Sequence, residues 1–162
     1  MASRFERLKK YQGKPTSFKI KNDDGEEEEW KIYPLPAKYM DLTIEAQSII
    51  NDAPNKVDSE GKEEKDDKGN PIKDTTKLSS EDKKRLRELN SEILITSIAF
   101  AECIRSGELD YSNFDKGIPD EIINEAKEAV GLMSMNYIAE IMVAISQANN
   151  LDLTGDKKKA EE

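Results

Sequence analysis

Alternating apolar and polar residues near the beginning of the chain predict two short β-strands. Phe18 and Ile20 are separated by a single polar residue, and Trp30 and Ile32 are spaced in the same way. Since side chains alternate between the two faces of a strand, each pair is expected to share one face. The Asp-Gly sequence at positions 24–25 suits a tight turn. The pattern therefore predicts a β-hairpin before any helix begins.

The second strand of this hairpin is expected to begin late, because the four glutamates at positions 26–29 are poor strand formers. An isolated two-stranded hairpin is only marginally stable in water. The apolar side chains of both strands must therefore pack against the helices that follow, which supply the only other apolar surface.

After the hairpin, apolar residues recur at the three- and four-residue spacing of amphipathic helices. Prolines 34 and 36 end the second strand and precede the first helix. Ser79 or Ser80 is expected to cap a long helix that ends before Gly107. A third helix is expected from Asp120, and the segment 134–150 is the most apolar of all. The residues expected to face the core include Leu42, Ala46, Ile49, Ile50, Leu86, Leu89, Ile93, Phe100, Ile104, Ile122, Ala126, Ala129 and Val130.

The segment 54–78 interrupts this helical pattern with a dense mixture of charges. It holds six lysines, seven acidic residues and very few large apolar side chains. Such a segment buries too little apolar surface to offset the entropy lost on ordering. We therefore predict a disordered, charged insertion between two helices. The two near-repeats in its "SEGKEEKDDKGN" sequence are interpreted as loop filler rather than as a structural repeat.

The fold class predicted for these 162 residues is mainly α, with an N-terminal β-hairpin packed on a small bundle of about four helices and a disordered charged insertion. One globular domain is expected overall. Its parts are a basic N-terminal arm (1–16), the hairpin with the first helix (17–53), the flexible insertion (54–78), the helical core (79–150) and a flexible tail (151–162).

The charge is distributed unevenly at the N-terminus. Residues 1–21 hold seven basic residues against Glu6, whereas the next eight residues hold six acids and no base. Two interpretations stay open for the basic arm. It is either a solvated segment or a segment that docks on an acidic surface, such as that of a neighbouring copy.

The composition argues against several classes of function. A formal net charge of -9 argues against general binding to nucleic acids or anionic membranes, because both need a cationic surface. No stretch has the roughly 20 apolar residues of a membrane span, and the N-terminus has no apolar run of the signal-peptide type. A single cysteine excludes an internal disulfide. We expect a soluble, cytoplasmic protein.

No catalytic or metal-binding motif is found in the sequence. The chain has no histidine, which is the usual general base and a common zinc ligand. It contains no glycine-rich phosphate loop, and its acidic clusters do not fit the spacing of a calcium-binding loop. Cys103 is expected to be a small buried side chain, since no histidine can activate it. We therefore predict a protein that is not an enzyme and that needs no cofactor.

The final helical segment suggests a surface for a partner. Methionine is adaptable filler in ordinary cores, and it also occurs at surfaces that accommodate varied helices. Either this helix is the central element of the bundle, or part of its apolar face is exposed and binds another helix or another copy of the chain. The candidate partner-binding residues are Met135, Ile138, Ile141, Met142 and Ile145.

The order of these parts resembles the tail assembly chaperones of long-tailed bacteriophages and prophages. The resemblance lies in the hairpin sequence "FKI…EWKIYPLPAKYMDL", in which a strand runs through "PLPAKY" into a helix, followed by a charged linker and acidic helices. It covers roughly residues 17–53, and residues 79–150 as a helical pattern only. The long charged insertion departs from the family pattern.

The resemblance implies a non-enzymatic protein that keeps the long helical tape-measure protein soluble while the tail tube forms, and that is absent from the finished particle. Its implied partners are a tape-measure-like helical client and possibly further copies of itself, in the cytoplasm of the host cell. Two alternatives stay open. One is a structural virion component, such as a head–tail adaptor or tail-completion protein, and the other is an acidic regulator of a basic host protein.

Overall fold

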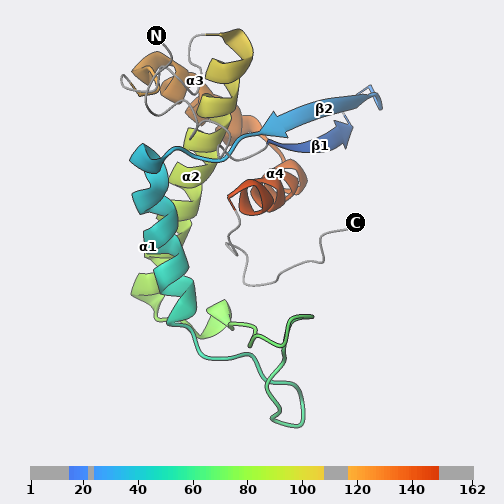
Figure 1. Cartoon of the computed structure of the whole chain (residues 1–162), viewed down its shortest axis with the longest axis vertical. Helices are drawn as coiled ribbons and strands as arrows, with labels where there is room; N and C mark the ends of the chain where they lie inside the picture. Colours follow the sequence, from blue (N-terminus) through green and yellow to red (C-terminus); the bar gives the residue numbers. More distant parts are fainter. Residues whose placement is uncertain (1–14, 22–23, 108–116, 150–162) are drawn as a thin grey trace, which may run out of the picture.

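A two-stranded antiparallel hairpin and four α-helices make up the described fold, which confirms the predicted mainly α class (Figure 1). The computed structural model describes residues 15–21, 24–107 and 117–149. The strands are β1 (Thr16–Lys21) and β2 (Glu27–Ile32). The helices are α1 (Met40–Asn51), α2 (Ser80–Ser106), α3 (Asp120–Leu132) and α4 (Met135–Ala148), with short 3-10 turns at Ala37–Tyr39 and Thr75–Lys77.

The 27-residue helix α2 is the central element, and α1, α3, α4 and β2 all contact it. Its N-terminus is capped as the sequence predicts, because the Ser79 side chain accepts a hydrogen bond from the Asp82 backbone N–H at 3.1 Å. Helix α1 runs antiparallel to α2 along its first half (Figure 1). Helix α3 and the hairpin lie against its second half.

The hydrophobic core follows the predicted apolar faces of the helices. Its largest fully buried side chains include Phe100 and Ile93 of α2, Ile50 of α1 and Ile32 of β2. Leu42, Ile49, Ile104, Ile122 and Val130 pack against this core while partly buried. Ala129 differs from the prediction, because its position on α3 is exposed. Apart from Ala129, the residues predicted to face the core are therefore buried or packed against it.

The second strand begins earlier than predicted, because three glutamates lie within β2. Each of them is paired with a residue of β1, and lysines stand opposite two: Lys19 opposite Glu29, and Lys21 opposite Glu27. Lys19 Nζ also lies 3.6 Å from a Glu27 carboxylate oxygen. Opposite charges across an antiparallel pair stabilise it modestly, which compensates for the low strand propensity of glutamate.

Polar contacts between distant segments fix the ends of the hairpin and of the helices. The Leu35 backbone N–H donates to Asn149 Oδ1 at 2.7 Å, which joins the end of the hairpin to the end of α4. The Tyr137 hydroxyl donates to the Lys21 carbonyl. At the other side of the fold, the Ile118 backbone N–H donates to the Tyr39 hydroxyl at 2.9 Å. These bonds satisfy backbone groups that no helix or strand would otherwise satisfy.

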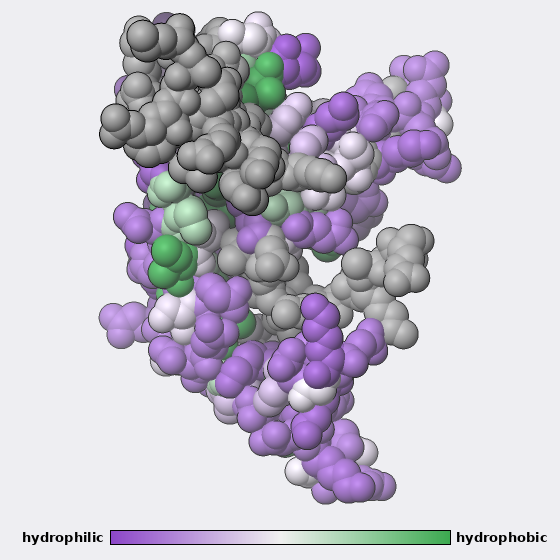
Figure 2. All heavy atoms as spheres, in the orientation of Figure 1, coloured by the Kyte–Doolittle hydropathy of each residue, from purple (hydrophilic) through white to green (hydrophobic). Residues whose placement is uncertain are grey.

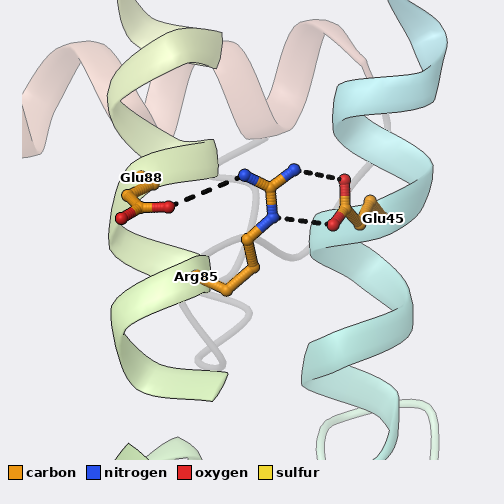
Figure 3. A network of polar contacts seen from close by, with 3 residues as sticks. All are labelled: Glu45, Arg85 and Glu88. Atoms are coloured by element: carbon orange, nitrogen blue, oxygen red, sulfur yellow. Dashed lines mark hydrogen bonds and ion pairs between the residues drawn. The ribbon is translucent and has the colours of Figure 1, made fainter. Parts of the chain in front are cut away.

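One ion-pair network joins α1 to α2 (Figure 3). Arg85 donates two hydrogen bonds to the Glu45 carboxylate, both at 2.8 Å. The Arg85 guanidinium also lies 3.6 Å from Glu88 on its own helix. These hydrogen bonds from Arg85 hold the pKa of Glu45 below its ordinary value of 4.5. The two-pronged geometry gives this exposed contact between the two helices a defined orientation.

The segment 54–78 is ordered by hydrogen bonds, so the prediction of a disordered insertion is wrong. It lies beyond the end of α1 and the beginning of α2, at the lower end of the molecule (Figure 1). Three backbone bonds close a ring: Lys56 N–H to the Ile72 carbonyl, Ile72 N–H to the Glu64 carbonyl, and Glu64 N–H to the Lys56 carbonyl, at 2.7, 3.0 and 2.8 Å. Isolated antiparallel bridges flank each of these bonds.

The ring repeats every eight residues, so the interpretation as loop filler is also wrong. Asp58, Asp66 and Asp74 occupy equivalent positions in the three repeats 55–62, 63–70 and 71–78. Each carboxylate accepts a hydrogen bond from the backbone N–H two residues further on, and the first two accept another from the N–H four residues further on. Aspartate is well suited to such turns because its short side chain reaches its own backbone. Backbone pairing and aspartate turns, rather than apolar burial, hold this segment together.

Substitution of Asp58 tests whether the aspartate turns hold the ring. In Asp58→Ala, the loss of net hydrogen-bond stabilisation of about 1 kcal/mol should speed exchange of the Lys56, Glu64 and Ile72 amides about fivefold. Glu60→Ala removes the same charge from the same turn and should leave exchange unchanged. Hydrogen exchange followed by NMR measures both. Equal acceleration in the two variants would show that charge, not turn geometry, matters.

The Arg85–Glu45 pair predicts a pH dependence of stability. Because the pKa of Glu45 is lowered in the folded state, its contribution is fully present above its ordinary value of 4.5 and is lost as the pH falls through the lowered pKa. Urea unfolding should therefore show Glu45→Gln less stable than the wild type at about pH 7, with the difference shrinking as the pH falls below 4.5. Glu128→Gln, an exposed carboxylate on α3, is the matched control. A difference that persists at low pH would contradict this account.

Candidate functional site

The fold divides the predicted partner-binding residues of α4 into two groups. Ile141 and Ile145 are 1% and 0% exposed and belong to the core. Ile138 and Met142 are partly buried against it, and only Met135, at 76% exposure, lies fully in solvent. Both strands of the hairpin contact α4. They cover part of the broad apolar face for which the sequence allowed either a core role or a partner-binding role. Ile141 and Ile145 therefore stabilise the fold instead of offering a surface to a partner.

An apolar groove lies on another part of the molecule, between β2, α2 and α3. Its volume is about 820 Å³, which is in the range of about 300–1,000 Å³ typical of binding pockets. Its apolar lining consists of Trp30 of β2, Tyr33 directly after that strand, Ile98, Ala99 and Ala101 from α2, and Ile122, Ala126, Ala129 and Met133 from α3 and its end.

Small side chains explain why the groove stays open. α2 supplies Ala101 and α3 supplies Ala126 and Ala129, where larger residues would fill the space between the two helices. The wall on the hairpin side is aromatic. Tyr33 packs edge-on against the buried Phe100 ring of α2, with ring centroids 6.3 Å apart and an interplanar angle of 80°. The fold therefore builds an apolar floor of small residues beside a fixed aromatic wall.

The rim of the groove carries more negative than positive charge. Its carboxylates are Glu28 and Glu29 of β2, Glu102 of α2 and Glu125 of α3, and its cations are Lys31 and Arg105. Arg105 and Glu102 pair with each other through two hydrogen bonds, one of them at 2.8 Å. This pair lowers the pKa of Glu102 and raises that of Arg105. The rim thus carries four carboxylates against two cations, so its net charge is negative.

Two exposed apolar side chains extend the apolar character beyond the groove. Leu132 at the end of α3 is 89% exposed, and Met135 at the start of α4 is 76% exposed. Met133, between them in the sequence, lines the groove itself. On the face viewed in Figure 2, hydrophobic residues lie in small patches within a mainly hydrophilic surface. The Leu132–Met135 turn and the groove thus form the main candidate binding surface.

The side chain that the sequence analysis weighed as a nucleophile lies in the core. Cys103 is fully buried on α2, as the sequence predicts. Within the described ranges, no three His, Cys, Asp or Glu side chains are grouped so that they could hold a metal ion. Among the helices of these ranges, none combines enough length with enough apolar character to traverse a bilayer.

Comparison with protein-family models, with curated proteins and with solved structures finds no match for this chain. The groove is therefore the feature on which an assignment of function has to rest. Sequence reasoning missed it because alanines at helical spacing look like ordinary core positions. The sequence features that could have indicated the groove are the alanines of α2 and α3 and the only tryptophan of the chain.

Proposed function

We propose that this protein is a non-enzymatic phage tail assembly chaperone that binds a tape-measure-like helical client and keeps it soluble in the cytoplasm of the host cell. The observation that carries the proposal is the apolar groove between β2, α2 and α3. An amphipathic helix binds such a groove by inserting apolar residues at helical spacing. Trp30 and Tyr33 would supply the aromatic contacts that commonly dominate such interfaces.

The side chains around the groove suit a client whose sequence varies along its length. Met133 and Met135 are unbranched and flexible, so they adapt to differently shaped apolar side chains. The small residues of the groove floor admit large side chains from the client. The hydrophilic surface around the groove and the net charge of -9 keep the carrier soluble while an apolar surface is presented.

A charge placed inside the groove tests this proposal. Ala129→Glu puts a carboxylate on the exposed part of the groove floor, where client binding would bury it without a partner, so client affinity should fall by about tenfold or more. Isothermal titration with an amphipathic tape-measure fragment, and the soluble yield of that fragment on co-expression, measure the effect.

Ala139→Glu is the matched control, since it makes the same change at an exposed position of α4 outside the groove. This variant should bind the client like the wild type. Equal binding by both variants would remove the groove from the proposal. Failure of the wild-type chain to raise the soluble yield of any tape-measure fragment would reject the chaperone function, and finding the protein in purified particles would favour a structural virion role.

A further inference from the structure

We propose that residues 1–14 of the same chain dock into the groove and compete there with a partner helix. These residues lie outside the described part of the structure. Docking of the arm stands on the groove alone, whereas competition with a client rests on the proposed function. The chain would thereby cover its own apolar groove until a client displaces the arm.

The sequence of the arm has the chemistry of a groove ligand. Phe5, Leu8 and Tyr11 follow one another at intervals of three residues. In a helix, residues three apart are neighbours on one face, so these three large side chains could enter an apolar groove together. The residues between and beside them are mostly basic, with Arg4, Arg7, Lys9, Lys10 and Lys14 set against the single acid Glu6.

The charge of the arm is complementary to the rim of the groove. Four glutamates line the groove, namely Glu28, Glu29, Glu102 and Glu125, against the two cations Lys31 and Arg105, so its lining carries a net negative charge. A basic segment lying in the groove would place its charges beside these carboxylates. Such exposed pairs are screened over about 8 Å at physiological salt. Docking should therefore weaken as the salt concentration rises, while the apolar contacts remain.

The place where the arm joins the fold favours docking within one chain over docking on a second copy. The described chain begins at Pro15, and the next residue, Thr16, is paired with Ile32 of β2. Tyr33, the following residue, lines the groove. The arm therefore starts beside the aromatic wall of the groove. Fourteen residues in a helix span about 21 Å, and a short tether gives a millimolar effective concentration.

Competition with an added peptide tests this docking. A labelled peptide of residues 1–14 is titrated into the full-length chain and into the full-length triple variant Phe5→Ala/Leu8→Ala/Tyr11→Ala. If the tethered arm fills the groove, the triple variant should bind the peptide about tenfold more tightly, the ratio expected for a millimolar effective concentration and a Kd of about 0.1 mM. Trp30, the only tryptophan, lines the groove, so its emission should shift to the red in the triple variant and back when the peptide is added.

The control is Leu151→Ala/Leu153→Ala, which removes apolar side chains from the other end of the chain and should match the wild type. Ala129→Glu introduced into the triple variant should abolish peptide binding. Equal peptide affinity in the wild type and the triple variant, or peptide binding that Ala129→Glu does not weaken, would overturn the proposal. Wild-type Trp30 emission that depends on protein concentration would assign the arm to a second copy and overturn docking within one chain.

These outcomes are separable from those of the client experiment. Arm docking without client binding would reject the chaperone function and leave the docking intact. Client binding that is equal in the wild type and the triple variant would reject the arm as a competitor and leave the chaperone function intact.

Discussion

Packing against α2 is the constraint on which the rest of the structure depends. The chain has few apolar residues for its length, and 36% of it is charged, so it cannot build separate cores for the hairpin and for each helix. Leu89, Ile93 and Phe100 are completely buried along α2, where α1, α3, α4 and β2 all meet. A two-stranded hairpin has little stability of its own. Ile32 becomes fully buried only because β2 lies on this shared core.

The groove follows from the same arrangement. Both β2 and α3 pack on the second half of α2, and the space between them is bordered by alanine side chains that are too small to fill it. Close packing is the rule in protein interiors, so an apolar space of this size is retained only where something else can occupy it or where it opens to solvent. The T-shaped contact between Tyr33 and Phe100 holds the hairpin wall at a fixed position against α2. The shape of the groove is therefore set by the core and does not depend on its occupant.

Residue patterns predicted the helices and strands better than the contacts between them. The spacing of apolar residues identified the hairpin and the helices because local periodicity records which side of an element is buried. It could not show that the hairpin would lie on α4, so a core role and a partner-binding role both stayed open for Ile141 and Ile145, which belong to the core. The groove was missed for a related reason. An alanine at a helical position is equally compatible with tight packing and with a hollow, and only the placement of β2 and α3 distinguishes the two.

The segment 54–78 shows that amino-acid composition alone does not decide whether a segment is ordered. The prediction of disorder rests on the small apolar area that the segment can bury, which is correct for its side chains. It left out the backbone, whose groups pair around a closed ring, and the carboxylates of Asp58, Asp66 and Asp74, which fix the turns. The recurrence of aspartate at intervals of eight residues was visible in the sequence. Because such a ring needs no apolar core, it can stand at the far end of the molecule, and its dense charge keeps that end hydrophilic. The groove lies at the opposite end of α2, beside the hairpin and α3.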